Sequence, residues 1–227
     1  MKKIRRTSLL FIALIGSCLF SSCFDLVEQI DMNHDGSGQI KATLNLSKSK
    51  TKVASLLKLR SVNGIKIPSE ATIRQEMEKT VRTLKATSGI SNVQYSLDLT
   101  NYIAVLSCNF KNVQALNNFS RTMSQQLKTQ ISSYNSYSFD PTTQTFSRTY
   151  KYSPEWAKEF SKIPSNDQKL FGDAYYTNII RFQKNIKSQT NKQAKVSSNA
   201  RGVMLKVKAT DLINGNTSLA NTVTLTK

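Results

Sequence analysis

The chain has 227 residues and a formal charge of +18, but it contains only one histidine and three cysteines. So few histidines and cysteines argue against a metal centre built from these residues and against a nucleophilic triad. The length is ample for one large domain or two small ones.

A secretory leader is predicted at the N-terminus. Basic residues at positions 2–6 precede the apolar run Ser8–Phe20, which is shorter than the roughly 20 residues of a membrane-spanning helix. The run ends in "FSSC", Phe20–Cys23, which resembles the lipobox of bacterial lipoproteins. By that resemblance, residues 1–22 are a lipoprotein signal peptide. Cys23 is then the first mature residue and carries fatty acyl chains such as palmitate.

Two alternatives stay open for this leader. It could be an ordinary signal peptide that contains cysteines, or cleavage could occur at Cys18, which ends the similar box "IGSC". Cleavage at Cys18 would leave only Leu9–Leu14 as the apolar segment, below the roughly 7–15 residues that are usual. With Cys23 acylated, Cys108 is alone in the mature chain. We therefore expect no intramolecular disulfide, and a hydrophobic core must hold the fold.

The mature chain begins with a predicted β-hairpin, because two runs with period-two alternation flank the turn Asn33–Gly38. From Asp31 onward the stretch also begins like the calcium loop of an EF-hand. However, position twelve, where an EF-hand has a bidentate glutamate, is Ala42. We predict a plain turn in which Gly36 and Gly38 adopt positive φ, with weak calcium binding as the alternative.

About three amphipathic helices are predicted. Ser47 is a candidate N-cap for a lysine-rich helix over Lys48–Leu59, and Ser69 caps the next helix. Apolar residues at helical spacing from Val113 to Ile131 predict the third helix.

Between the second and third predicted helices, two runs in which apolar and polar residues alternate predict a pair of strands. In the second run, Cys108 shares a face with Leu106 and Phe110. We therefore expect a buried and unreactive thiol.

The C-terminal half is predicted to be rich in strands. Residues 134–156 are aromatic, and Asp140 followed by proline indicates a hairpin turn. The shared face of Phe146, Tyr150 and Tyr152 predicts core packing, with a ligand-stacking surface as the alternative.

Together these elements predict an α+β fold in which antiparallel hairpins pack against the helices. We expect a single domain over residues 23–227. Any subdivision is expected near residues 164–168, where a Pro and polar residues follow one another.

Basic residues gather in two stretches without acidic residues, 36–69 and 174–210. In a cytosolic protein such stretches would suggest nucleic acid. For an exported protein we expect anionic lipid or an acidic polymer as the partner, and no nucleic acid. The residues predicted to bind lipid or polyanion are Lys48, Lys50, Lys52, Lys58 and Arg60.

The mature start, "CFDLVEQIDMNHDGSGQIKATLNLSKSKTK", resembles lipoproteins of unknown function that are common in Bacteroidota. This opening and residues 181–212 are also more distantly similar to the LppM-like lipoproteins of actinobacteria. The resemblance implies an envelope lipoprotein that contacts lipids, and it supplies no catalytic residue.

The function expected from the sequence is that of a membrane-anchored envelope lipoprotein, on the periplasmic side or at the cell surface. It would act as a non-catalytic binding or structural protein held close to the membrane, because Leu26 follows the acylated Cys23 within about 12 Å. No cofactor and no metal site are predicted. The alternatives are a carboxylate-dependent hydrolase of the envelope and a weak calcium-binding module.

Overall fold

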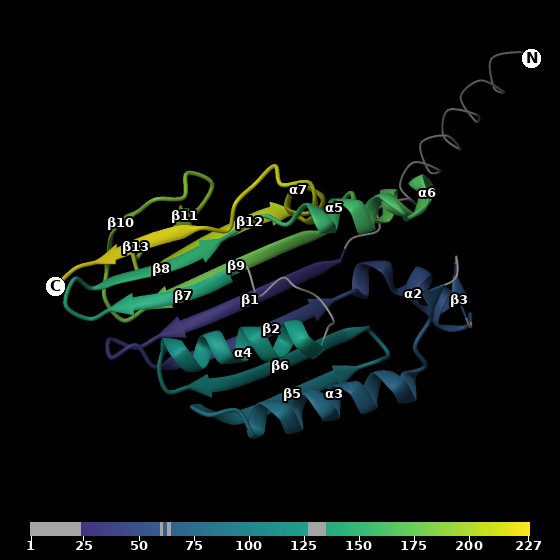
Figure 1. Ribbon diagram of the computed structural model, residues 1–227, viewed down its shortest axis with the longest axis horizontal. Coiled ribbons are helices and arrows are strands. Elements are labelled where there is room, and N and C mark those ends of the chain that lie inside the picture. Colours follow the sequence, from purple (N-terminus) through teal and green to yellow (C-terminus); the bar gives the residue numbers. More distant parts are fainter. Residues whose placement is uncertain (1–23, 60, 63–64, 127–134) are drawn as a thin grey trace, which may run out of the picture.

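The computed structural model describes residues 24–59, 61–62, 65–126 and 135–227. A seven-stranded sheet and a four-stranded sheet are combined with helices (Figure 1). This arrangement confirms the predicted α+β class, with antiparallel hairpins and a β-rich C-terminal part. A further two-stranded sheet consists of β3 (Ser61–Val62) and β4 (Ile65–Lys66).

The large sheet is built from both halves of the chain. Its strand order is β11-β12-β9-β1-β2-β6-β5. The bounds are β1 (Asp25–Met32), β2 (Gly38–Asn45), β5 (Ile90–Asp98), β6 (Ile103–Phe110), β9 (Tyr175–Phe182), β11 (Lys195–Val196) and β12 (Gly202–Lys208). Neighbouring strands are antiparallel except β1 and β9, which run parallel with Asp25 opposite Tyr175. The hairpin pattern of the sequence did not predict this parallel pair.

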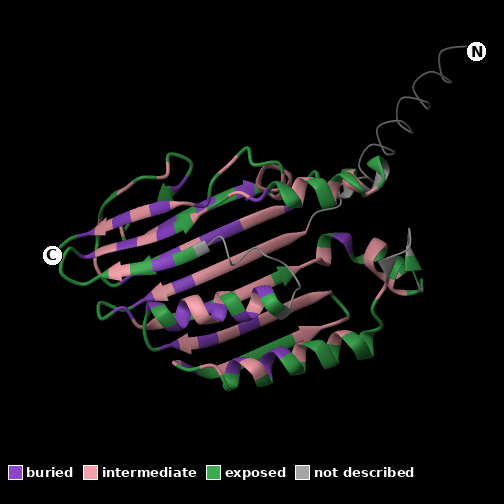
Figure 2. Cartoon of the chain, viewed as in Figure 1, coloured by how far each residue is buried: buried purple, intermediate pink, exposed green. Residues whose placement is uncertain are grey.

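One row of side chains illustrates how the sheet contributes to the core. The register places five buried apolar residues side by side across five strands: Val203, Ile180, Ile30, Ile40 and Cys108. Figure 2 shows buried positions along these same strands. Each strand therefore presents alternate apolar residues to one inner face, as period-two alternation requires.

Cys108 is part of this row and has no exposed surface. Burial raises the pKa of its thiol to about 12, so the reactive thiolate is suppressed. The expectation of a buried cysteine is confirmed.

The small sheet packs on the inner face of the large sheet. Its order is β10-β13-β8-β7, with bounds β7 (Asn135–Asp140), β8 (Thr145–Tyr150), β10 (Ile186–Gln189) and β13 (Asn221–Leu225). The ring of Phe146 on β8 meets that of Phe182 on β9, with 5.7 Å between centroids. This contact joins the two sheets through an edge-to-face aromatic pair.

Two long helices cover the other half of the inner face, α3 (Glu70–Lys85) and α4 (Val113–Gln126) (Figure 1). The backbone N–H of Thr72 donates to Ser69 Oγ at 3.1 Å, which confirms the predicted N-cap. The helix predicted from Val113 begins there, and its predicted end, 127–131, lies outside the described residues.

The first predicted helix is shorter than expected and is divided into η1 (Ser47–Ser49) and α2 (Lys50–Leu57). Ser47 is the first residue of η1 rather than an N-cap, since Leu46 and Ser49 hold the N-cap positions of η1 and α2. Its backbone N–H donates to Asn45 Oδ1 at 2.9 Å. An asparagine at the end of β2 therefore satisfies the first backbone N–H of η1.

Several short helices lie at the end of the molecule where β1 begins (Figure 1). They are α5 (Pro154–Ser161), α6 (Ser165–Gln168), η3 (Lys169–Phe171) and α7 (Ala209–Ile213). Within the described ranges, no helix is both long and apolar enough to cross a membrane. The subdivision expected near 164–168 falls on α6, and the number of domains stays a prediction.

The turn of the first hairpin differs in one respect from expectation. Gly36 adopts φ +84°, as predicted, but Gly38 is not among the positive-φ glycines. A Cβ on Gly38 would lie 2.1 Å from the carbonyl oxygen of Asp31, so this position requires glycine because of close backbone approach. Asp35 accepts hydrogen bonds from the hydroxyl and the N–H of Ser37, and these lower the pKa of its carboxyl group.

Candidate functional site

A cavity of about 370 Å³ lies beside the first half of β1. Leu26 and Glu28 of β1 and Ala42 of β2 line it from the large sheet, while Phe119 and Met123 line it from α4. Its volume is within the range of pockets that bind small molecules, and most of its lining is apolar.

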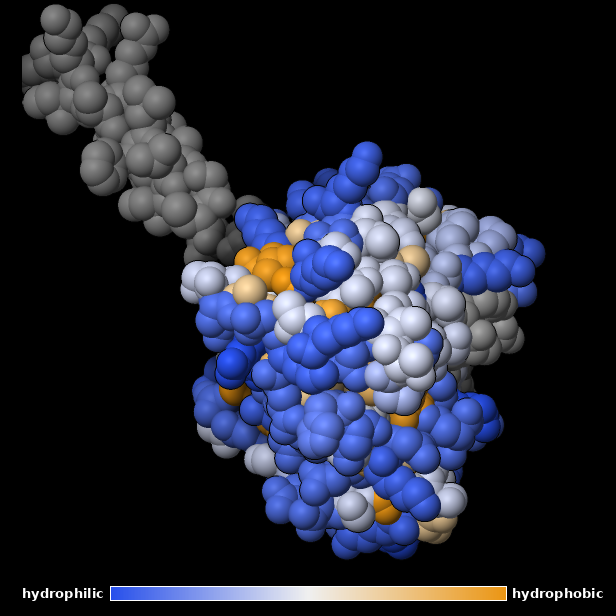
Figure 3. Space-filling model, turned by 90° about the vertical axis from the view of Figure 1, so that its left-hand side faces the viewer, coloured by the Kyte–Doolittle hydropathy of each residue, from blue (hydrophilic) through white to orange (hydrophobic). Residues whose placement is uncertain are grey.

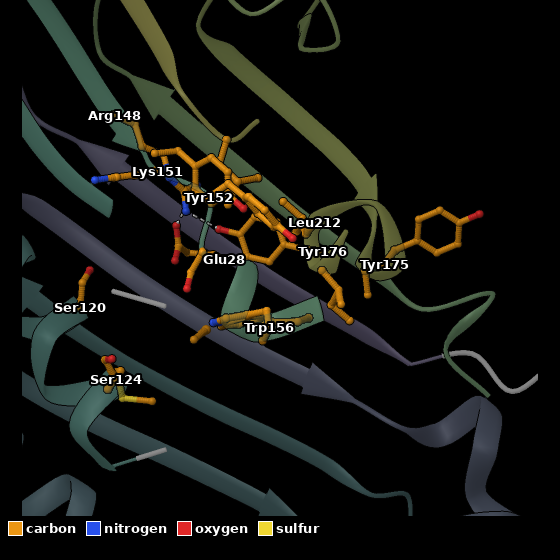
Figure 4. A pocket seen from close by; sticks show the side chains of 18 of the residues that line it. Glu28, Ser120, Ser124, Arg148, Lys151, Tyr152, Trp156, Tyr175, Tyr176 and Leu212 are labelled. Carbon is orange, nitrogen blue, oxygen red and sulfur yellow. Dashed lines mark hydrogen bonds and ion pairs between the residues drawn. The ribbon is translucent and has the colours of Figure 1, made fainter. Parts of the chain in front are cut away.

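Aromatic side chains form much of the remaining wall. Tyr150 is the last residue of β8. Tyr152 follows this strand, and Trp156 belongs to α5 (Figure 4). Phe24 and Phe171 also line the cavity, and their rings pack edge to face with 5.5 Å between centroids. Phe146, Tyr150 and Tyr152 were expected to pack in the core on one face. Phe146 is buried there, whereas Tyr150 and Tyr152 line the cavity.

An ion pair between a buried arginine and a half-buried glutamate lies within this lining. Arg148 on β8 is 4% exposed, and its Nη1 is 3.5 Å from Oε1 of Glu28 on β1 (Figure 4). The same Oε1 accepts hydrogen bonds of 2.8 Å from the Tyr137 hydroxyl and from Asn178 Nδ2. Arg148 Nη2 donates to the Tyr176 hydroxyl at 2.9 Å. The two charges are thus compensated inside the protein, as burial demands.

Aromatic rings further stabilise the arginine. Its Cζ is 5.5 Å from the ring centroids of both Tyr137 and Tyr176, a cation–π distance. Burial alone would lower the pKa of Arg148, but the neighbouring Tyr137, Tyr176 and Glu28 outweigh it and raise the pKa above its usual value. Burial also raises the pKa of both tyrosines, so their hydroxyls remain protonated donors.

The guanidinium keeps unused hydrogen-bonding capacity. Arg148 Nε makes no hydrogen bond with the described residues, and Nη1 has only the longer ion-pair contact with Glu28. Buried N–H groups in proteins nearly always have an acceptor. Both nitrogens have almost no exposed surface, so these donors lie behind the cavity wall rather than on it.

The residues predicted to bind lipid or polyanion lie elsewhere. Cys23 and Arg60 are outside the described residues. Lys48 pairs with Asp25 at 3.3 Å, and Lys50 donates to Asn101 Oδ1 at 3.3 Å. The predicted lysines all belong to η1, α2 and the residue after it, and they do not line the cavity.

Glu28 and Arg148 were not predicted as site residues, although the sequence around each of them carries a signal. Glu28 alternates with Leu26 and Ile30, and Arg148 lies between Phe146 and Tyr150, so each is a charge on an apolar strand face. Across the part of the chain that the structure describes, no three His, Cys, Asp or Glu side chains are grouped so as to hold a metal ion.

No family model matches the chain, and no curated protein sequence matches it. Among solved structures, the chain is similar to the folded domain of the LppM protein of Mycobacterium tuberculosis, determined by NMR. The TM-score is 0.44 and the sequences are 11% identical over 91% of each chain. The resemblance to LppM-like lipoproteins is thus matched by a distant structural similarity. This similarity gives no information about function. The resemblance to Bacteroidota lipoproteins stays a prediction.

Proposed function

We propose that this protein is a membrane-anchored envelope lipoprotein whose domain binds an amphiphile, a molecule with an acyl chain and a small polar group. The cavity beside β1 carries this proposal, because it combines an apolar, aromatic wall with one compensated charge pair. Such pockets bind ligands mainly through apolar burial and orient them through a few polar groups. Phe24, which follows the proposed acylation site directly, is part of the wall.

A binding role is better supported than the hydrolase alternative. Glycoside hydrolysis uses two carboxyl groups that flank the scissile bond. Among the described residues that line the cavity, Glu28 is the one carboxylate, and its Oε1 is engaged by Tyr137, Asn178 and Arg148. This environment suits a structural and orienting charge rather than a general acid or base.

In the proposed arrangement, the η1–α2 segment lies close to an anionic membrane or acidic polymer. Each lysine near an anionic leaflet contributes about 1 kcal/mol of attraction. The orientation is supported by the position of α2 at the end of the molecule where β1 begins (Figure 1). The opposite end, seen in Figure 3, is covered mainly by hydrophilic residues with small separate hydrophobic spots.

We expect membrane attachment to depend on Cys23. The change Cys23→Ser should abolish labelling by radioactive palmitate and release the protein from the membrane fraction, because one serine cannot carry the acyl chains. Cys18→Ser is the matched control and should keep both labelling and attachment. Loss of labelling in the Cys18 variant alone would assign the anchor to Cys18 instead.

Amphiphile binding can be followed through Trp156, the single tryptophan of the chain, which lines the cavity. A brominated monoacylglycerol should quench its fluorescence in a saturable manner when added to the acylated protein in amphipol. Ala42→Phe places a ring in the cavity and should weaken this quenching at least about tenfold, since the ring competes for the same apolar volume.

Thr43→Phe is the control for this experiment. It adds the same ring to the same strand, but on the opposite face of the sheet. We expect quenching to be unchanged in this variant, with melting temperatures confirming that both variants fold. Equal quenching of the wild type and Ala42→Phe would refute binding in the cavity.

A further inference from the structure

We propose that the amphiphile presents an uncharged hydrogen-bond donor, a hydroxyl group, to the Glu28 carboxylate inside the cavity. This inference rests on the proposed function, and it narrows the ligand class to lipids that carry a hydroxyl group and no charge, such as monoacylglycerols and fatty alcohols. Three features of the described residues carry it: the open oxygen of Glu28, the arginine behind it, and the apolar surroundings.

One oxygen of the Glu28 carboxylate is left open to the cavity. Tyr137 and Asn178 both donate to Oε1. The ion-pair contact from Arg148 ends on Oε1 as well (Figure 4). Oε2 accepts none of these contacts, yet it is not among the described side-chain atoms that are both enclosed and without a hydrogen-bond partner. Because Glu28 lines the cavity and its side chain is 20% exposed, Oε2 is the accessible polar atom of the ion pair.

This open oxygen selects a ligand that donates a hydrogen bond. A carboxylate oxygen has two lone-pair sites, so Oε2 can accept from a ligand even though the Tyr176 hydroxyl also interacts with the Glu28 carboxylate. Hydrogen bonds to a charged acceptor are among the stronger ones. A hydrocarbon or an ether placed against Oε2 would exclude water from this oxygen without replacing the lost hydrogen bond, which is unfavourable in an apolar cavity.

The charge of Arg148 then selects a donor that is itself uncharged. Arg148 lies behind the cavity wall, where it already compensates the charge of Glu28. A ligand ammonium would add a positive charge to this balanced pair, and an uncompensated charge in an apolar cavity is unfavourable. A ligand carboxylate would face the Glu28 carboxylate, because the free donors of Arg148 are enclosed and out of its reach. A hydroxyl group donates to Oε2 and leaves the charge balance unchanged.

The proposal is tested with four brominated lipids that share one hydrocarbon chain: dibromostearyl alcohol, its methyl ether, dibromostearylamine and dibromostearate. Each is added to the acylated full protein in amphipol at pH 7.5, and quenching of Trp156 gives the dissociation constant. Quenching of Ala42→Phe, recorded with each probe, corrects for partition into the amphipol. We expect the alcohol to bind at least about tenfold tighter than each of the other three, since it alone is an uncharged donor.

Glu28→Gln is the sharpest variant, because it changes the open acceptor into a donor. Tyr137 and Asn178 both need an acceptor, so the carbonyl oxygen of the glutamine takes the place of Oε1 and its NH2 group that of Oε2. The alcohol should then bind no more than about twofold tighter than the ether, since the oxygen of either can accept from the NH2 group. Dibromostearate should bind at least about tenfold tighter than it binds the wild type, since Arg148 has lost its counterion.

Glu76→Gln is the matched control for this variant. It makes the same change at an exposed ion pair with Lys79 on α3, outside the cavity lining. We expect the order of the four probes and their ratios to stay as in the wild type. Melting temperatures show whether both variants fold.

The outcomes separate the two proposals. Equal binding of the alcohol and its methyl ether, both blocked by Ala42→Phe, would overturn this inference while the cavity remains a binding site. Tighter binding of the ammonium or the carboxylate than of the alcohol would overturn it as well, and so would an unchanged preference in Glu28→Gln. Quenching that Ala42→Phe does not weaken would refute the proposed function and this inference with it. The wild-type comparison requires no variant at Glu28, so it holds even if Glu28→Gln folds poorly.

Discussion

Replacing Glu28 by alanine is expected to lower the free energy of unfolding by about 3–5 kcal/mol. The change leaves the charge of Arg148, whose side chain is 3% exposed, without its counterion. It also removes the acceptor of the Tyr137 hydroxyl and of Asn178. Buried groups that lose a partner pay the full desolvation penalty, which is larger than the net value of the bond. Urea unfolding of the chain without residues 1–23, followed by circular dichroism, measures the loss.

A double-mutant cycle shows whether the loss of stability comes from the ion pair between Glu28 and Arg148. Arg148→Met should also destabilise strongly, but Glu28→Ala combined with Arg148→Met should lose less than the sum, since no charge is then left buried alone. Glu76→Ala is the matched control, because Glu76 pairs with Lys79 on the exposed surface of α3. It should change stability by no more than about 1 kcal/mol. A loss below about 1 kcal/mol for Glu28→Ala would contradict the buried-pair interpretation.

Gly38→Ala is expected to destabilise the fold by about 3 kcal/mol or more, at the upper end of overpacking effects. A Cβ at this position would lie 2.1 Å from the Asp31 carbonyl oxygen and 2.6 Å from Cζ of Phe110. The first contact is backbone within the β1–β2 hairpin, and the second is a buried ring of β6. Neither group can move aside without breaking the sheet register. The midpoint of urea unfolding should fall accordingly.

Gly172→Ala is the control for this prediction. Gly172 is exposed, has φ −58°, and an added Cβ would lie 3.3 Å from the nearest atom, the carbonyl oxygen of Lys169. Because an alanine adopts this conformation easily, stability should change by no more than about 1 kcal/mol. Similar effects of the two substitutions would mean that the close approach at Gly38 does not decide stability.

Local patterns in the sequence were sufficient to predict much of the fold. Alternation on either side of Asn33–Gly38 and around Asp140 predicted hairpins that the structure contains. Helical spacing after Ser69 and from Val113 predicted α3 and α4. These signals work because turns, caps and periodicity involve residues close together in the chain.

Features that depend on distant residues were not predictable in this way. Nothing local indicates that β1 pairs with β9, because the two strands are separated by most of the chain. The cavity depends on the same long-range packing, since Leu26, Met123 and Trp156 meet only in the folded protein. Glu28 and Arg148 each showed a charge on an apolar strand face, but their partnership follows from the assembly of two sheets.

The position of β1 in the sheet also governs the order in which the chain can fold. β1 is the first strand of the described chain, yet one of its edges is completed by β9, 150 positions later along the register. Contacts of such high sequence separation slow folding, because a long loop must close before they form. During synthesis, the β1–β2 hairpin therefore keeps an unpaired strand edge until residues 175–182 have been made. Meanwhile this edge is a site for chaperone binding or for wrong pairing, so this fold benefits from release of the whole chain before collapse.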